Sequence, residues 1–125
     1  MSRLPIRCLI VDDHRPFLEA ARVLLEREGL SVVGLALTGA EALRSADELR
    51  PDVVLVDVSL GDESGFDVVR SLMAQEHADG TVAVLISTRS EAELTELIAQ
   101  SPAAGFVSKA ELSADAIRRF VDGRA

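Results

Sequence analysis

Residues 8–13 read Cys-Leu-Ile-Val-Asp-Asp, an apolar run that ends in two carboxylates, and residues 53–57 read Val-Val-Leu-Val-Asp, a run that ends in one. Short branched apolar runs bounded by polar residues are typical of strands buried inside a parallel sheet. In open α/β sheets, ligands gather at the carboxyl ends of the strands. We therefore expect the carboxylates of Asp12, Asp13 and Asp57 to meet at one edge of a sheet.

Strand-like and helix-like stretches alternate five times along the chain. The expected strands are residues 6–11, 32–37, 53–57, 82–87 and 104–108. Regular β-α alternation predicts an α/β fold in which a parallel sheet carries helices on both faces, and five strands fit the flavodoxin-like order 2-1-3-4-5. The first and third strands are neighbours in that order, which places Asp57 beside Asp12 and Asp13.

The stretches between the strands carry helix signals. Phe17, Ala21 and Leu25 share one face of the first expected helix, and Gly29 follows as a C-terminal stop. Serines stand where the third, fourth and fifth helices are expected to begin, and they are the predicted N-caps: Ser64, Ser90 and Ser113.

Length and composition narrow the class of protein. The 125 residues fit one domain, residues 1–125, and 48% of them are apolar, which is enough for a core. A net charge of −8 argues against nucleic-acid binding by this domain, because such binding depends on neutralising phosphates. The only cysteine, Cys8, is expected to be an inert core residue. No apolar run is long enough to span a bilayer and residues 1–5 have no signal-peptide core, so we expect a cytoplasmic protein without membrane contact.

Three carboxylates at one edge would repel one another unless a positive charge lay among them. An all-oxygen site of this kind suits a hard divalent cation, Mg²⁺ or Mn²⁺, and indicates metal-dependent phosphoryl chemistry. Two more polar residues end strands on the same edge: Ser87 follows the run at 82–86, and Lys109 follows the run at 105–108.

Together these positions resemble the receiver domain of bacterial two-component response regulators, over essentially the whole chain. The matching features are the acidic pair after the first strand, the lone Asp after the third, the hydroxyl residue after the fourth, the Lys after the fifth, and Phe106 three residues before that Lys. The run at residues 11–14, Val-Asp-Asp-His, and a Lys109 not followed by Pro are similar to receivers of the NarL/LuxR type.

The resemblance implies that Asp57 accepts a phosphoryl group from a histidine kinase or a phosphotransfer protein. It also implies that Asp12, Asp13, Asp57 and the backbone carbonyl of Ser59 hold the metal ion. Lys109 and the hydroxyl of Ser87 would then bind phosphoryl oxygens.

The resemblance further implies a switch in which Ser87 is drawn towards the phosphoryl group and the ring of Phe106 rotates into the vacated space. The face formed by the fourth helix, the fifth strand and the fifth helix would change. It would control a partner or an attached DNA-binding output domain, with homodimerisation on phosphorylation as a further expectation. Ser59 and Arg89, each two residues past a site residue, would tune the lifetime of the acyl phosphate.

The loop after Asp57 departs from the family. Leu60-Gly61 stands where Leu-Pro or Met-Pro is frequent, and this predicts a less rigid loop. The acidic residues that follow, Asp62, Glu63 and Asp67, are expected to be solvated charges near a helix start rather than ligands.

The leading interpretation is a signalling phosphoacceptor with at most slow self-dephosphorylation. Three other functions remain open from the sequence. A hydrolase of the haloacid-dehalogenase type would need an acid at position 14, where the chain has His14. A flavin carrier would need a phosphate loop after the first strand and more aromatic residues than the 3% present. A receiver-like scaffold that works without phosphate would be indifferent to Asp57→Asn. Sequence reasoning also leaves open the cognate kinase, the output partner, and whether the chain is a stand-alone receiver or part of a longer regulator.

Overall fold

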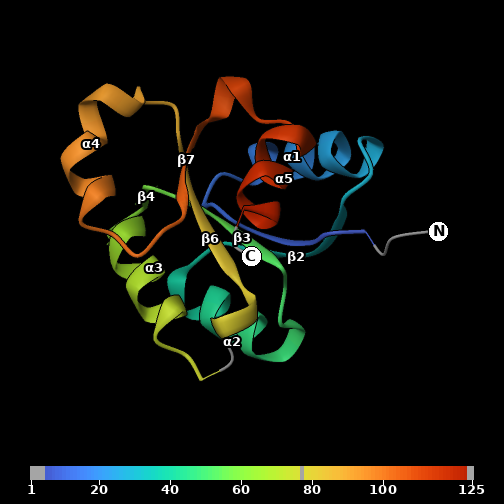
Figure 1. Ribbon diagram of the computed structural model, residues 1–125, viewed down its shortest axis with the longest axis horizontal. Coiled ribbons are helices and arrows are strands. Elements are labelled where there is room, and N and C mark those ends of the chain that lie inside the picture. The colour runs from blue at the N-terminus through green and yellow to red at the C-terminus, as the bar shows by residue number, and fades with distance from the viewer. Residues whose placement is uncertain (1–4, 77, 124–125) are drawn as a thin grey trace.

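The computed structural model of the chain describes residues 5–76 and 78–123, and its centre is a five-stranded parallel sheet. The strands are β1 (Arg7–Val11), β2 (Ser31–Ala36), β3 (Val53–Asp57), β6 (Val82–Ser87) and β7 (Gly105–Ser108). Their order is β2-β1-β3-β6-β7 (Figure 1). The predicted order 2-1-3-4-5 is therefore confirmed, and each strand begins and ends within one residue of its expected bounds.

The central strands β3 and β6 are apolar up to their last residues, Asp57 and Ser87, because helices cover both of their faces. All residues of β3 and β6 are buried, and so is β1 beyond Arg7. The edge strand β2 is only half-buried over most of its length. Continuous apolar runs, rather than alternating ones, are what a strand covered on both faces requires.

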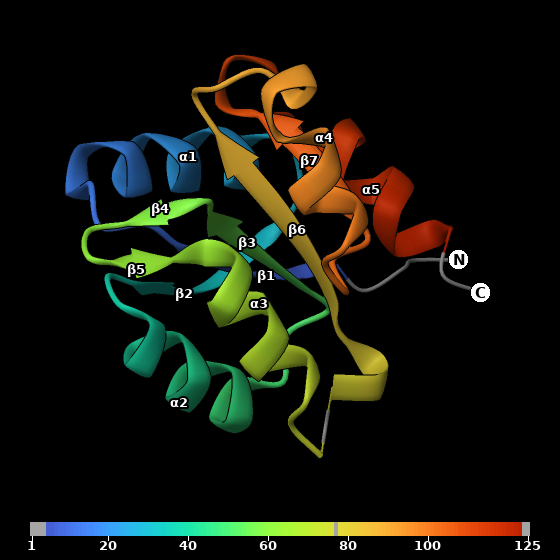
Figure 2. The ribbon, with the colours of Figure 1, turned by 90° about the vertical axis from the view of Figure 1, so that its left-hand side faces the viewer.

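Within residues 5–76 and 78–123, five α-helices form the two outer layers: α1 (Arg15–Arg27), α2 (Gly39–Leu49), α3 (Gly65–Met73), α4 (Glu91–Ala99) and α5 (Ala114–Asp122). In Figures 1 and 2, α1 and α5 lie together on one side of the sheet, and α2 and α3 lie on the other. The core is divided in the same way. One cluster joins residues of α1 and α5 to the sheet, and the other joins residues of α2, α3 and α4 to it.

Local signals explain where the helices begin and end. The side chains of Ser64 and Ser113 accept hydrogen bonds from Phe66 N and Ala116 N, as N-caps do. At α1, Gly29 adopts a φ of 102°, the left-handed conformation that ends a helix. Ser90 is the N-cap residue of α4 as predicted, although its hydroxyl bonds Oε1 of Glu93 at 3.3 Å and accepts no hydrogen bond from a backbone N–H within the described residues.

Short elements that no pattern in the sequence predicts follow Asp57, precede β6 and begin at Lys109. Two-residue strands β4 (Ser59–Leu60) and β5 (Glu63–Ser64) form a small antiparallel hairpin, and 3-10 turns occupy η1 (Ala78–Gly80) and η2 (Lys109–Glu111). The hairpin lies at the same end of the molecule as the start of α1 (Figure 2). Elements this short have no periodicity, so they cannot be read from residue spacing.

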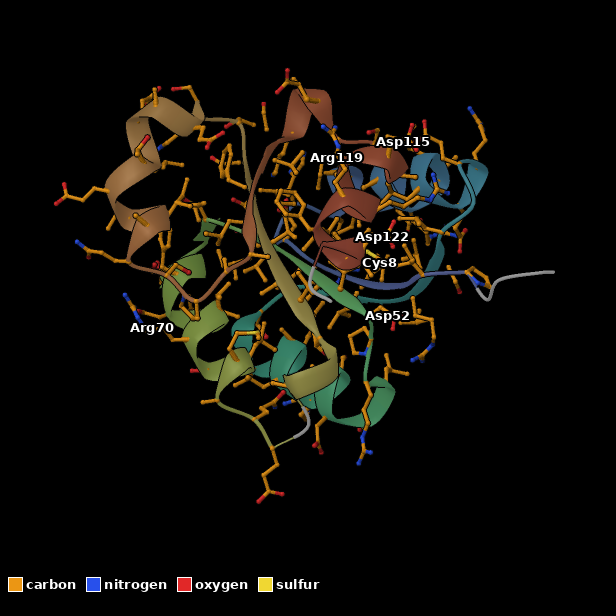
Figure 3. The ribbon with its side chains drawn as sticks, viewed as in Figure 1. Cys8, Asp52, Arg70, Asp115, Arg119 and Asp122 are labelled. Carbon is orange, nitrogen blue, oxygen red and sulfur yellow. The ribbon has the colours of Figure 1, made fainter. Side chains whose placement is uncertain are left out.

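Cys8 lies fully buried in the interior beside α5 (Figure 3). Burial raises the pKa of its thiol to about 12, in accord with the expected inert core residue. Within the described residues, none of the helices combines the length and the apolar character needed to cross a membrane. The expected location rested in part on the lack of a signal-peptide core in residues 1–5. Of these, residues 1–4 lie outside the described residues.

Candidate functional site

Three strands end in the same kind of turn at the carboxyl edge of the sheet. A side-chain oxygen of Asp12, Asp57 or Ser87 accepts a hydrogen bond from the backbone N–H two residues further along, at 2.9, 3.0 and 2.9 Å. Short polar side chains favour such turns because they replace a backbone acceptor. Each turn leads the chain away from the sheet, and in both aspartates it uses Oδ1 and leaves Oδ2 for other partners.

The structure brings the three predicted carboxylates together. One oxygen from each of Asp12, Asp13 and Asp57 can be chosen so that all three lie within 4.8 Å of one another. Asp12 is fully buried, Asp57 is 8% exposed, and Asp13 is exposed. Burial is the main effect on Asp12 and raises the pKa of its carboxyl group.

Lys109 bridges two of these carboxylates. Its Nζ lies 2.6 Å from Oδ2 of Asp12 and 2.8 Å from Oδ2 of Asp57. Burial by itself lowers the pKa of Lys109, but the hydrogen bonds and charges of Asp12 and Asp57 outweigh that effect and raise it above its ordinary value. The ammonium is thus held as a fixed positive charge among the acidic groups.

The aromatic ring of Phe17 forms a further contact with this lysine. Nζ of Lys109 lies over the ring, 4.2 Å from its centroid, at a distance typical of a cation–π interaction. Sequence reasoning assigned Phe17 only to the apolar face of the first helix. The available signal was its position: it is the third residue of a helix that begins two residues after Asp13, at the edge where the polar residues gather.

Two residues hold the loop after Asp57 in place, and sequence reasoning missed both. A Cβ at Gly65 would collide with the carbonyl oxygen of Asp57, so only glycine lets α3 begin this close to the strand end. Glu63 Oε2 accepts a hydrogen bond from Gly39 N at 3.0 Å, at the start of α2. Glu63 was expected to be merely solvated; it ties the hairpin to α2, and with the β4–β5 pairing this restrains a loop that lacks proline.

Ser59, Ser87 and Arg89 lie at or just past the strand ends that carry the site, and among the described residues no hydrogen bond joins their side chains to the carboxylates. Ser87 is buried and its hydroxyl oxygen accepts from Arg89 N, while the side chains of Ser59 and Arg89 are exposed. Ser59 touches Asp57 through its backbone N–H, and a metal-binding role for its carbonyl stays a prediction.

Phe106 lies away from the carboxylates, on β7. It is half-buried and lines a groove of about 660 Å³ between α4 and α5, together with Ser90, Glu91, Arg119 and Phe120. Figure 3 places Arg119 on α5, on the side from which this groove is lined.

The acidic cluster has the chemistry of a site for a divalent cation. When all three carboxylates are ionised, the single ammonium of Lys109 leaves two negative charges uncompensated. Hard oxygen ligands, one of them solvent-exposed, are the donor set that Mg²⁺ prefers. The residues present therefore fit such an ion.

The comparisons with known proteins agree with this arrangement. The family model of the response regulator receiver domain matches residues 8–121. The chain belongs to the receiver domain family. This family serves two-component signalling, and the membership gives no support to the hydrolase and flavin-carrier alternatives.

The chain is similar to parts of two differently named proteins. This chain is 39% identical over 105 residues to the response regulator GacA of Pseudomonas viridiflava, across 83% of this chain and 48% of that protein. It is 40% identical over 106 residues to a protein-glutamate methylesterase/protein-glutamine glutaminase of Myxococcus xanthus, across 84% of this chain and 30% of that protein.

Among solved structures, the receiver domain of the putative response regulator NarL from Mycobacterium tuberculosis superposes with a TM-score of 0.84 at 29% identity. The match covers 98% of this chain and 100% of that one. The likeness to NarL/LuxR-type receivers is therefore confirmed. The receiver spans about half the length of the curated regulators it matches.

Proposed function

We propose that Asp57 accepts a phosphoryl group from a histidine kinase or a phosphotransfer protein, in a reaction that depends on Mg²⁺ or Mn²⁺. One observation carries the proposal: three carboxylates from two strand ends meet beside the ammonium of Lys109, at the edge of the sheet where ligands bind. The whole chain, residues 1–125, would act as one receiver domain. We propose the cytoplasm as its place in the cell.

Asp12, Asp13 and Asp57 would hold the metal ion, with the backbone carbonyl of Ser59 as an additional ligand. When bound, the ion supplies Lewis-acid polarisation of the phosphoryl oxygens and neutralises charge. Asp12 is already oriented for this role, because its Oδ1 accepts from His14 N and its Oδ2 from Lys109.

The chemical step would use a carboxylate oxygen of Asp57 as the nucleophile. It attacks phosphorus and forms the acyl phosphate, while the bond from phosphorus to the donor breaks and the donor imidazole leaves with the electron pair. Ser59 N fixes the carboxylate plane by its bond to Oδ1 at 3.0 Å. Because phosphoryl transfer needs mainly positioning and charge stabilisation, such fixed groups account for most of the protein's contribution.

Lys109 and Ser87 would donate hydrogen bonds to the oxygens of the new phosphoryl group. Lys109 loses the charge of the Asp57 carboxylate when that group is phosphorylated, and the phosphoryl oxygens replace it as the ammonium's partner. The hydroxyl of Ser87 uses its oxygen to accept from Arg89 N, so its proton is available for donation. A charge-assisted bond to a phosphoryl oxygen is stronger than a neutral one and would draw Ser87 inward.

The switch would follow from that movement. Phe106 lies on β7, next to β6, and the Ser87–Ser108 pair joins the same two strands. Its ring borders an open groove between α4 and α5, so the ring has space on that side. Phosphate would favour the arrangement of α4, β7 and α5 that bonds it better, and that face would contact a partner, a second copy or an attached output domain.

Ser59 and Arg89 would set the lifetime of the acyl phosphate, because their exposed side chains lie beside the strand ends that carry the site. The module would thus be a signalling phosphoacceptor with at most slow self-dephosphorylation, rather than an enzyme with turnover. The dephosphorylation rate of Arg89→Ala tests this part; a rate equal to that of the unchanged chain would remove Arg89 from it.

The experiment for the main proposal is treatment with acetyl phosphate and Mg²⁺ followed by intact mass measurement. One phosphoryl group should be added, and none in Asp57→Asn or with a chelator present. Asp62→Asn, an exposed carboxylate of the same loop, is the matched control and should be modified like the unchanged chain. Modification of Asp57→Asn would reject the assignment, and a complete lack of modification would favour the scaffold that works without phosphate.

A further inference from the structure

The ring of Phe17 is the only non-acidic group for which the structure gives a contact with the Lys109 ammonium, within the described residues. Phe17 comes from the first turn of α1, whereas the two carboxylate partners follow β1 and end β3. A lysine ammonium has three donor hydrogens, and it donates two hydrogen bonds, one to Asp12 and one to Asp57. The ring adds an attractive surface that carries no charge of its own.

The burial of the pair makes this contact stronger than one at an open surface. The Lys109 side chain is 14% exposed, and Phe17 is half-buried against the core layer that joins α1 and α5 to the sheet. A cation over a ring gains more when water is excluded from the contact. The ring also covers part of the ammonium that water would otherwise hydrate.

We infer that Phe17 is a positioning residue that holds Lys109 at the site while its acidic partners change. This inference rests on the proposed function, because it concerns what Lys109 does when Asp57 is phosphorylated. During the proposed reaction the Asp12 carboxylate would be engaged by a metal ion and the Asp57 carboxylate would be phosphorylated, so their bonds to Nζ are not constant. The Phe17 ring is neither titrated nor modified, and it keeps the flexible lysine side chain at the place where the phosphoryl oxygens arrive.

The bland alternative is that Phe17 is simply a packing residue of α1. The two roles differ in what they require of the side chain. Packing is satisfied by an aliphatic residue of similar size, whereas attraction to the ammonium needs the negative face of an aromatic ring. Phe17→Leu therefore removes the attraction with little loss of packing, and Phe17→Tyr keeps both.

The chain offers an unusually clean probe, because Lys109 is its only lysine. Protein labelled with ¹³C at the lysine ε-carbon gives one side-chain signal, which belongs to Lys109 without further assignment. The ring should shield the attached protons, so they should resonate upfield of an ordinary lysine in the unchanged chain and in Phe17→Tyr. They should return to the ordinary position in Phe17→Leu. If these protons resonate at the position of an ordinary lysine in the unchanged, unphosphorylated chain, the contact between Lys109 and the Phe17 ring is absent and the inference is overturned.

The functional readout is the rate of phosphorylation by acetyl phosphate at fixed Mg²⁺. Phe17→Leu should react about three- to tenfold more slowly, and Phe17→Tyr should stay within about twofold of the unchanged chain. Leu24→Ala, at a half-buried position of the same helix, controls for general loosening of α1 and should also stay within about twofold. Equal rates for Phe17→Leu and the unchanged chain, or equal slowing of the Leu and Tyr variants, would contradict the positioning role.

A further substitution keeps the test valid if Phe17→Leu fails to fold. Pentafluorophenylalanine at position 17 preserves the ring's shape but reverses its face charge, and it should slow phosphorylation like Phe17→Leu. The failures are distinguishable. If the unchanged chain takes no phosphate, the proposed function and the inference built on it both fall. If the unchanged chain takes phosphate and the fluorinated chain does so equally fast, only the inference falls.

Discussion

Nζ of Lys109 lies 2.8 Å from Oδ2 of Asp57, although the two residues are 52 positions apart in the sequence. The same nitrogen bonds Oδ2 of Asp12 at 2.6 Å, so one ammonium bonds two acidic groups from two different strand ends. Lys109 thus supplies the positive charge that offsets part of the repulsion between these carboxylates.

We predict that Asp57→Asn lowers the pKa of Lys109 when a chelator is present, because the amide keeps the shape of the carboxylate but not its charge. In the unchanged chain this pKa lies above the ordinary value of 10.5. The stabilisation that Lys109 gives the fold is therefore complete below pH 10.5 and is lost as the pH rises through the folded-state pKa. The pH dependence of the single lysine ε-¹³C signal measures the pKa of Lys109. Asp62→Asn should leave the titration unchanged, and identical curves for Asp57→Asn and the unchanged chain would contradict the prediction.

A second prediction concerns Gly65, whose position lets α3 start against the backbone carbonyl of Asp57. Gly65→Ala should destabilise the fold by about 1–3 kcal/mol, because the new methyl group must displace the carbonyl of the residue that accepts phosphate. Phosphorylation by acetyl phosphate should slow in the same variant. Urea denaturation and intact mass measure the two effects.

Gly80→Ala is the matched control for this substitution, since a Cβ at Gly80 would meet nothing within 4 Å. It should be neutral or stabilise the fold by up to about 1 kcal/mol, by reducing the freedom of the unfolded chain. Equal stability of the two alanine variants would show that the close approach at Gly65 does not matter.

The fold was predictable because its signals are repeated and local. The apolar runs at 53–57 and 82–87 have no polar interruption, and the structure buries every residue of both. Their alternation with helical spacing leaves few topologies, since parallel strands need crossover connections of one hand. The hairpin of β4 and β5 was not predicted, because two residues per strand carry no period. Ser90 was correctly predicted as an N-cap, but its hydroxyl bonds a glutamate instead of a backbone N–H.

The candidate site was predictable only in part, for a related reason. Asp12, Asp13, Asp57 and Lys109 each lie at or just past the end of a recognisable strand, so the strand order alone brings them together. Phe17 and Glu63 belong to other elements, and their contacts depend on side-chain directions that no spacing rule supplies. Their residue types were also misleading, because an aromatic residue on an apolar helix face suggests packing and an acid near a helix start suggests solvation.

A third prediction concerns the bond from Glu63 to Gly39 N, which ties the hairpin after Asp57 to the start of α2. Glu63→Ala should lower the free energy of unfolding by about 0.5–1 kcal/mol, because a helix N-terminus loses both a hydrogen-bond acceptor and a favourable negative charge. Glu63→Gln, which keeps an acceptor, should lose less. Urea denaturation in chelator measures both. Asp62→Ala, in the same hairpin, should stay within about 0.5 kcal/mol of the unchanged chain; a loss as large as that of Glu63→Ala would show that the tie to α2 contributes nothing specific.

The last prediction follows from the burial of Cys8, which raises the pKa of its thiol from 9.0 to about 12. Between these pH values only the unfolded chain gives up the thiol proton, so the free energy of unfolding falls as the pH rises through that window. Cys8→Val, which cannot ionise, should show a smaller alkaline loss of stability than the unchanged chain. The comparison isolates the thiol because Lys109, which also titrates above pH 10.5, is present in both chains. In the folded protein at pH 8, the thiol should resist a disulfide reagent and become reactive in urea, and rapid labelling without denaturant would contradict its placement inside the core beside α5.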